Sequence, residues 1–377
     1  MADLSRVKRT VLLLVTISLL LTSCKDRLDL ENVTLVLMEG IDIDKDNNLL
    51  IYMSSPVFSK EAKKKNEETV VKAMSPRDAR GYFEAKVSAL VSTGKLQNLL
   101  VSKKLMQHPY WYKLLDVLFR DAKVRANARI IMVDGDVKDV MFFEPENKRR
   151  LPLHIAKLLD TAHERNLVEV TTLFTMQRLL YEKGVTPYLT ELRREPKEIR
   201  LLGTAMLDNN GKYVTSLSLV ENELLQILQD EKYQDLTLTV ILPEKEKPDT
   251  IFHMGTMSFY IKKVNRKIKS SYKDGKFQFD FDLGLPIQIT ERLFDYNVQD
   301  EPQKLEKMIN EQLTEEFKKL VSKLQKNKVD PIGLGLYARA FQYHNWKKVQ
   351  NNWPEAFAEA KITVHVHTKI KDYGEIK

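Results

Sequence analysis

The sequence predicts a mixed α/β protein, α+β in its last third, in which a signal peptide precedes about three mixed domains. Apolar runs of strand length alternate with amphipathic helical patterns through the first half of the chain. Hairpin turns are expected at Asp208-Asn209-Asn210-Gly211 and Lys273-Asp274-Gly275-Lys276, each of which stands between two strand patterns. A long amphipathic helix is predicted over about residues 301–326, so the last domain should pack antiparallel strands on this helix.

The first domain is expected over residues 24–195, after a signal peptide over residues 1–23. A helix should begin after Ser75, because serine caps a first turn, Pro76 suits the first helical position and Asp78 completes the capping pattern. The other predicted strands cover residues 33–43, 49–57, 98–101 and 128–133, and the other predicted helices cover residues 109–120, 153–165 and 172–181.

A middle hairpin-helix-strand domain is expected over residues 196–248, and a C-terminal domain with a β-hairpin and the long helix over residues 249–377. The proline-bounded, charged stretch over residues 244–248 is a candidate linker. A second helix should begin at Asp330-Pro331, with the aspartate as cap and the proline in the first turn. The remaining predicted strands cover residues 199–207, 213–219, 236–242, 250–260, 264–272, 277–285 and 362–370, and a short helix covers residues 221–228.

Composition limits the class of protein. The chain has 377 residues, a net charge of +8 and one cysteine, so internal disulfides are excluded and the fold must depend on its core. Basic runs occur at Lys63-Lys64-Lys65, Lys148-Arg149-Arg150 and Lys262-Lys263. We interpret them as solvated loops and strand edges, and the alternative is attraction to anionic lipid headgroups. Nucleic-acid binding is not predicted, since the chain is predicted to be secreted and has no module of interleaved aromatic and basic residues.

The N-terminus has the layout of a secretory signal. Arg6, Lys8 and Arg9 precede an apolar run over residues 11–21, which is too short to span a bilayer. The run ends in Leu21, Thr22, Ser23 and Cys24, which is similar to the lipobox of bacterial lipoproteins. That resemblance implies recognition of Leu21, Thr22 and Ser23 by the signal peptidase, cleavage before Cys24 and a diacylglyceryl group on its thiol, with N-acylation left open. The alternative is an ordinary signal peptide or a signal anchor with a chance cysteine.

Three groups of residues resemble known sites only in part. Asp42, Asp44 and Asp46 alternate as in a calcium loop, but Asn47 and Met53 stand where glycine and the bidentate glutamate belong, so an acidic hairpin face is the better interpretation. His365 and His367 share one strand face without a matching third ligand. Gly333-Leu334-Gly335 is a fragment of a dinucleotide motif. We therefore predict no metal, no cofactor and no enzyme, although a catalytic triad scattered along the sequence stays open.

With these elements in place, the whole chain resembles the Ger(x)C family, the lipoprotein C subunits of spore germination nutrient receptors. The resemblance begins with the lipobox cysteine and the tether over residues 26–30, followed by a strand that ends in Gly40-Ile41-Asp42. Lys25 is a departure, because many members carry a tryptophan soon after the cysteine. The order of the motifs along the chain makes the resemblance specific. The further motifs are Ser75-Pro76-Arg77-Asp78-Ala79, Gly203-Thr204-Ala205 before Glu221, the stretch over residues 267–281, the long helix, Asp330-Pro331-Ile332-Gly333 and Trp353.

The resemblance implies a non-catalytic receptor component with three mixed domains. It places the protein on the extracytoplasmic face of the spore inner membrane, anchored through lipid at Cys24, with two membrane-embedded partners, the A and B subunits. The receptor answers nutrients and ends dormancy, and the C subunit is required for that response. One alternative is an extracytoplasmic solute-binding lipoprotein of a transporter, which would show two similar lobes around a cleft. Another is a cell-wall hydrolase, which would need an acid pair or a metal site.

Overall fold

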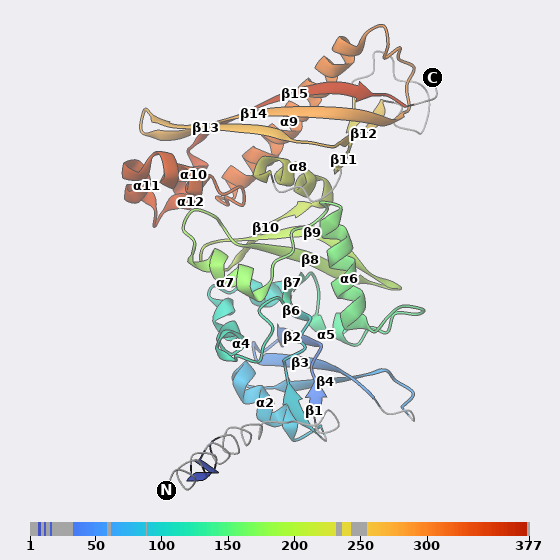
Figure 1. The fold of residues 1–377 in the computed structure, drawn as a ribbon, viewed down its shortest axis with the longest axis vertical. Helices are drawn as coiled ribbons and strands as arrows, with labels where there is room; N and C mark the ends of the chain where they lie inside the picture. Colours follow the sequence, from blue (N-terminus) through green and yellow to red (C-terminus); the bar gives the residue numbers. More distant parts are fainter. Residues whose placement is uncertain are drawn as a thin grey trace.

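The computed structural model describes residues 33–58, 62–87, 89–230, 236–242 and 255–374, together with residues 7, 8, 11, 12 and 16. The described chain is elongated, with the first strands at one end and the last sheet at the other (Figure 1). Three sheets and several helices make up the mixed α+β fold, as the sequence predicts. The predicted linker over residues 244–248 lies outside the described residues.

An eight-stranded sheet forms the N-terminal half of the molecule. Its strands are β2 (Met38–Ile43), β3 (Leu49–Pro56), β4 (Asn66–Lys72), β6 (Asn98–Ser102), β7 (Arg129–Val133), β8 (Tyr188–Glu195), β9 (Glu198–Leu207) and β10 (Tyr213–Ser218). They follow the order β10-β9-β8-β7-β6-β2-β3-β4. The four central strands, β2, β6, β7 and β8, are parallel to their neighbours in that group, and antiparallel strands extend both edges.

Helices cover both faces of this sheet, which explains why its central strands are buried. Leu99 and Val101 of β6 point into one core, whereas Leu100 between them points into the other. The predicted helix over residues 109–120 is in fact a 3-10 helix followed by a short α-helix. One face carries α2 (Pro76–Glu84), α3 (Lys103–Met106), the 3-10 helix Trp111–Leu115, α4 (Asp116–Arg120) and α7 (Leu173–Tyr181), and the other carries α5 (Val137–Met141) and α6 (Leu151–Glu164).

Side-chain caps begin two of the helices, and the predicted cap at Ser75 is confirmed. The amide of Asp78 donates to Ser75 Oγ at 3.1 Å, with Pro76 at the first helical position of α2. In α8 (Leu219–Gln229), Ser218 and Glu221 form a reciprocal capping box. Both caps rest on interactions within four residues, but only the cap at Ser75 is among the sequence predictions.

The predicted strand over residues 33–43 is two strands. β1 (Val33–Leu35) pairs in parallel with β5 (Leu90–Ser92) in a separate two-stranded sheet, and only β2 joins the large sheet. The chain changes partners at Val36 and Leu37, whose amides donate to Ser92 O and Ser54 O. The break follows from distant partners, so the apolar pattern alone does not reveal it.

The sheet runs across the domain boundary predicted at residues 195 and 196. β8 and β9 form an antiparallel hairpin on either side of this boundary, and β9 pairs in turn with β10. The hairpin expected in the middle domain therefore extends the sheet of the first domain. α8 follows directly after β10, and its buried leucines lie in the core of the C-terminal half.

A five-stranded sheet forms the C-terminal half. It contains β11 (Leu236–Ile241), β12 (Thr256–Ile261), β13 (Asn265–Lys273), β14 (Lys276–Arg292) and β15 (Lys361–Asp372). β12 and β13 pair with successive stretches of one edge of β14, and β15 pairs in parallel along the other edge. The turn between β13 and β14 has positive φ at Asp274 and Gly275, as the predicted hairpin requires.

The long helix α9 (Pro302–Lys326) packs along one face of this sheet (Figure 1). Phe279, Phe281 and Leu283 alternate along β14 toward that face, and Phe317 of α9 is fully buried among them. The predicted packing of antiparallel strands on a long amphipathic helix is therefore confirmed. Three short helices follow, α10 (Leu334–Phe341), α11 (Tyr343–Val349) and α12 (Trp353–Ala358), of which only the first was expected from the sequence.

A substitution at Gly203 tests the close approach of β9 to its neighbouring strand. Its φ is +143°, and an added Cβ would lie 1.9 Å from Leu217 O of the neighbouring strand. Gly203→Ala should therefore lower the free energy of unfolding by on the order of 3 kcal/mol or more. Gly81→Ala is the matched control, since an added Cβ there meets nothing within 4 Å inside α2. That change should raise the free energy of unfolding, measured with urea, by about 0.5–1 kcal/mol. Equal losses of stability at both sites would contradict the special geometry of Gly203.

Candidate functional site

The predicted lipid-attachment residues, Leu21, Thr22, Ser23 and Cys24, lie outside the residues that the structure describes. The processing of the N-terminus therefore stays a prediction. Within the described part of the chain, no helix is both long and apolar enough to cross a membrane.

The three alternating aspartates do not converge on one site. Asp42 is buried, and its carboxylate accepts hydrogen bonds from the amides of Ile43 and Val137, the second at 3.0 Å, so it holds the start of α5. Asp44 instead closes the turn of its own hairpin by accepting from the amides of Asp46 and Asn48. The predicted acidic face is wrong for Asp42, because this side chain points into the protein.

His365 and His367 are exposed on β15, on the face of the sheet away from α9. His367 Nε2 lies 3.5 Å from Asp282 Oδ1 on the neighbouring strand, and both side chains are more than half exposed. Among the described residues, no group of three or more His, Cys, Asp or Glu side chains is arranged to hold a metal ion.

The predicted helix start at Asp330-Pro331 is also corrected. α10 begins at Leu334, and Gly333 with φ +82° precedes it. Asp330 instead reaches forward, and its carboxylate accepts from the amides of Gly333 at 2.9 Å and Gly335 at 3.0 Å. The same carboxylate accepts from Trp353 Nε1 at 2.8 Å. The glycine pair therefore serves this structural centre and forms no part of a dinucleotide site.

Asp330 also connects the two halves of the molecule. Its carbonyl accepts from the amide of Thr186, in the segment between α7 and β8. We call residues 182–186 the joint loop. An added Cβ on Gly184 would lie 2.8 Å from the backbone of Gly335, so these two segments of the chain are in direct backbone contact. Glu182 pairs with Arg339 at 2.9 Å. The joint loop therefore fixes the C-terminal half against the large sheet.

A buried polar network lies beside this contact, between α8 and the large sheet. Thr204 Oγ1 donates to Asn222 Oδ1 at 2.7 Å and accepts from the amide of Glu169 at 3.1 Å. Gln226 Nε2 donates to the Glu169 carboxylate. All four side chains are at least nine-tenths buried. These buried hydrogen bonds favour one arrangement of α8 against the sheet, because each broken bond would leave a polar group without water.

A charged cluster that the sequence patterns do not predict lies at the carboxyl ends of the parallel strands. Lys103, directly after β6, lies 3.1 Å from Asp134 and 3.3 Å from Glu191. Arg193 of β8 pairs with the same Asp134. Ligands of open α/β sheets bind at this edge, and charged residues directly after two strand patterns were the available signal. Here the cations and carboxylates neutralise one another, so the cluster is structural.

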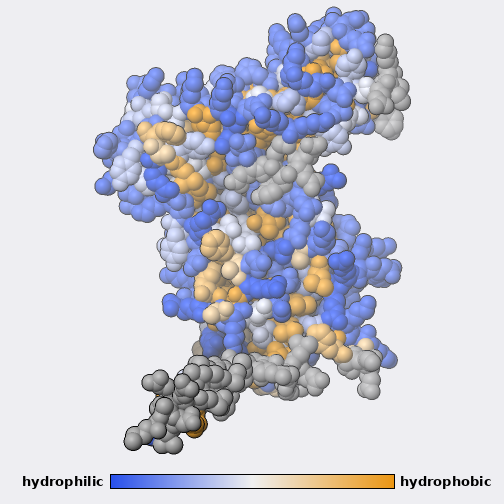
Figure 2. Space-filling model, viewed as in Figure 1, coloured by the Kyte–Doolittle hydropathy of each residue, from blue (hydrophilic) through white to orange (hydrophobic). Residues whose placement is uncertain are grey.

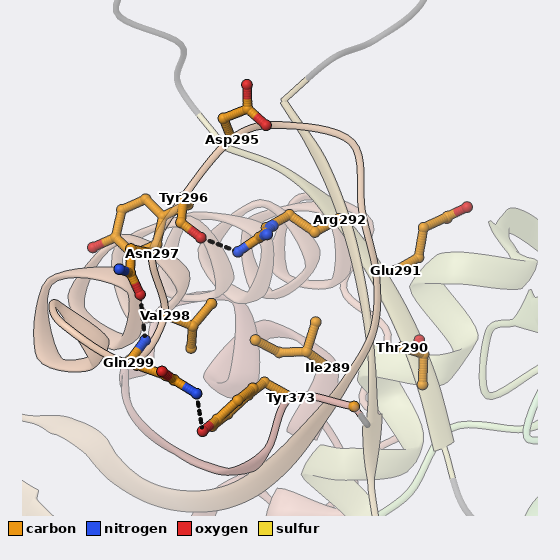
Figure 3. A pocket seen from close by; sticks show the side chains of 11 residues that line it. Ile289, Thr290, Glu291, Arg292, Asp295, Tyr296, Asn297, Val298, Gln299 and Tyr373 are labelled. Carbon is orange, nitrogen blue, oxygen red and sulfur yellow. Dashed lines mark hydrogen bonds between the residues drawn. The ribbon is translucent and has the colours of Figure 1, made fainter. Parts of the chain in front are cut away.

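A hollow with a volume of about 780 Å³ lies at the end of β14 (Figure 3). The polar groups around it bond to each other: Arg292 donates to Tyr296 O, and Gln299 Nε2 donates to Tyr373 Oη at 2.9 Å. Glu291 and Asp295 point away from the other labelled side chains. Among the described residues that line this hollow, no acid and base side chains converge.

The carboxylate of Asp330 allows a test of the contact between the two halves of the molecule, which we call the joint. Trp353→Phe removes a donor to a buried carboxylate, so the free energy of unfolding should fall by about 1.5–3 kcal/mol more than in a matched variant. Trp346→Phe is that match, because Trp346 is also buried but its Nε1 has no hydrogen-bond partner among the described residues. Urea unfolding of both variants measures the difference, and equal losses would mean that the indole bond does not stabilise the joint.

A half-buried glutamate on β2, Glu39, gives a prediction on pH. Burial raises the pKa of Glu39 to about 7, above about 4.3 in an unfolded chain. The protonated Glu39 carboxyl therefore contributes its full share to the free energy of unfolding below about pH 4, and this contribution is lost as the pH rises through about 7. Relative to wild type, Glu39→Gln should gain up to about 3 kcal/mol at about pH 8 and little at about pH 5. Urea unfolding at both pH values checks this, with Glu67→Gln, an exposed site on β4, as the control that should not change.

Comparisons with known proteins agree with the sequence resemblance. The family description "Spore germination protein N-terminal domain" matches residues 26–194, and "Spore germination B3/GerAC like, C-terminal" matches residues 202–374. Spore germination protein B3 of Bacillus subtilis (strain 168) is 23% identical over 381 residues, covering 95% of this chain and 96% of that protein. Spore germination protein A3 of the same organism is 23% identical over 384 residues, covering 98% of each.

A solved structure, the crystal structure of the GerBC protein, aligns with a TM-score of 0.57 at 21% identity. The alignment covers 88% of this chain and 97% of that chain, so the two share a fold. The relatives named here are spore germination proteins, which supports a role in spore germination and an association with spores. With both halves matched in order, the chain belongs to the Ger(x)C family of spore germination proteins.

Proposed function

We propose that this protein is the lipid-anchored C subunit of a spore germinant receptor and acts as a required, non-catalytic component of that complex. The observation that carries the proposal is the match over nearly the whole length of spore germination proteins A3 and B3. The lipobox-like stretch that ends in Cys24 adds the anchor. Under this proposal, lipid at Cys24 holds the protein to the extracytoplasmic face of the spore inner membrane, beside membrane-embedded A and B subunits.

The joint between the two halves supports a scaffolding role. Leu179 and Val185 from the first half share one hydrophobic core with Trp353 and Leu324 from the second half. The joint loop and the buried polar network add directional bonds to this core. A component fixed in one shape suits the holding of partners, whereas a binding protein that closes on a solute needs a hinge. The solute-binding alternative also finds no support in the comparisons, and we do not pursue it.

The domain division stays part of the proposal. We keep residues 24–195, 196–248 and 249–377 as the predicted units. The two family matches end at residue 194 and begin again at residue 202, on either side of the first boundary. The continuous sheet through β8 and β9 indicates that this boundary separates regions of the family pattern rather than two separate cores.

Complementation of a deletion strain tests the proposed function. Spores without the protein should lose the response to one set of nutrients, because the receptor is incomplete, yet still germinate with external calcium dipicolinate, which bypasses nutrient receptors. Wild type and Ser23→Ala should restore the nutrient response, since both keep a small residue before the cut. Cys24→Ala should not restore it, and the variant should stay unprocessed or be released from the membrane fraction by a salt wash, because the predicted lipid site is lost.

Two results would contradict the proposal. Normal germination of the deletion spores with every nutrient of a broad panel would remove the receptor role, and turnover of a cell-wall substrate by the purified protein would remove the non-catalytic role. Full rescue by a membrane-bound Cys24→Ala variant would contradict the lipid anchor alone.

A further inference from the structure

Two basic runs that lie far apart in the sequence meet in the structure. Lys63, Lys64 and Lys65 lie in the connection between β3 and β4, and Lys148, Arg149 and Arg150 lie in the connection between α5 and α6. All six residues line one open hollow of about 330 Å³. We call these six residues the basic rim.

The basic rim carries an excess of positive charge. Two carboxylates, Glu68 and Glu144, share the hollow with its six basic side chains. Glu144 pairs with Lys64 at 2.5 Å, but both side chains are about two-thirds exposed, so this ion pair contributes little. Lys63, Lys65 and Lys148 are exposed to solvent. With six basic side chains against two carboxylates, the rim is therefore a local source of positive potential.

Exposed phenylalanines accompany the basic rim. Phe58, in the same connection as the lysines, is 61% exposed, and Phe142, beside the second run, is 44% exposed. The Arg150 guanidinium lies 5.9 Å from the centre of the Phe58 ring. In Figure 2 the lower part of the molecule, which carries these connections, shows apolar residues among charged ones. Basic side chains beside exposed aromatic rings are typical of surfaces that lie in the headgroup region of a bilayer.

The basic rim lies at the end of the molecule where the described chain begins. The connection between β3 and β4 and strand β1 are both at this end, opposite the C-terminal sheet (Figure 1). The segment from Cys24 to Val33 spans at most about 30 Å when fully extended. A lipid on Cys24 would therefore keep this end close to the bilayer, at a high effective concentration of headgroups.

We propose that the basic rim binds the headgroups of an anionic phospholipid bilayer and serves as a second membrane contact of this protein. Each basic residue near such a surface contributes about 1 kcal/mol, and the attraction acts within a Debye length of about 8–10 Å. The diacylglyceryl group expected on Cys24 carries two acyl chains and can hold the protein to the membrane, so the rim contact would mainly orient this end of the protein against the bilayer. The headgroup contact goes beyond the proposed receptor function, and it does not require the lipid at Cys24.

Vesicle sedimentation of residues 25–377 tests the contact without the lipid, since these residues include every described strand and helix from β1 to β15. At about 0.1 M salt the protein should sediment with vesicles that contain about 30% phosphatidylglycerol and stay in solution with pure phosphatidylcholine. Raising the salt should weaken the binding. Equal binding to both vesicle types, or no binding to the anionic ones, would overturn the proposal.

Two double variants, each of which removes two positive charges, test whether the basic rim is the part of the protein that contacts the vesicle. Lys63→Gln with Lys65→Gln should weaken binding to the anionic vesicles at least about tenfold. The control is Lys262→Gln with Lys263→Gln, an exposed basic pair between β12 and β13 in the C-terminal half. The control should bind as wild type does, and an equal loss in both pairs would show that only net charge matters and would overturn the role of the rim.

A third variant separates the aromatic part. Phe58→Ser should reduce binding severalfold while the preference for anionic vesicles remains, because it removes apolar contact and keeps every charge. All of these side chains are exposed, so thermal unfolding midpoints should match wild type and sedimentation differences report binding. The vesicle result is independent of the germination result, so failure of the basic rim and failure of the receptor proposal are distinguishable.

Discussion

The arrangement of the molecule depends on one buried carboxylate. Asp330 is fully buried, and burial raises its pKa to about 6, while bonds from Trp353 Nε1 and the amides of Gly335 and Gly333 oppose that effect. A charge without water is tolerated only where donors replace the water, so these groups must stay in place together. They belong to the start of α10 and to α12, which fixes both helices relative to one another. The carbonyl of the same residue then holds the joint loop, and through it β8 of the large sheet.

The joint makes the two sheets parts of one body. Close backbone contact between Gly184 and Gly335 brings the joint loop against α10, and Val185 enters the C-terminal core. On the other side, α8 is bound to the large sheet through Asn222 and to α9 through the ion pair of Glu221 with Lys323 at 2.8 Å. A displacement of one half would break apolar packing and buried hydrogen bonds at the same time. These contacts therefore favour one relative arrangement of the two halves.

Short-range patterns in the sequence predicted most elements, and long-range partners account for the rest. The cap at Ser75 and the hairpin turn at Asp274 and Gly275 depend on neighbours within a few residues, and both are found as expected. The split of the first strand and the burial of Asp42 depend on Ser92 and Val137, which no local pattern identifies. The sequence predicts Asp330 as a helix cap, but its carboxylate also accepts a hydrogen bond from Trp353, far along the chain. The basic runs were visible in the sequence, whereas their meeting required the fold.

The same distinction explains why the family resemblance lies in the order of short motifs and in no single one of them. Gly203-Thr204-Ala205, Glu221, Asp330 to Gly333 and Trp353 are separate in sequence, yet each contributes to the joint or to the strand beside it. Gly203 leaves room for the neighbouring carbonyl, Thr204 bonds to α8, and Asp330 and Trp353 bond to each other. Each position has a geometric demand that few other side chains meet, whereas the surrounding apolar positions accept many. The chain shares the fold of the GerBC protein at 21% identity, and within this chain these are residues that hold the two halves in register.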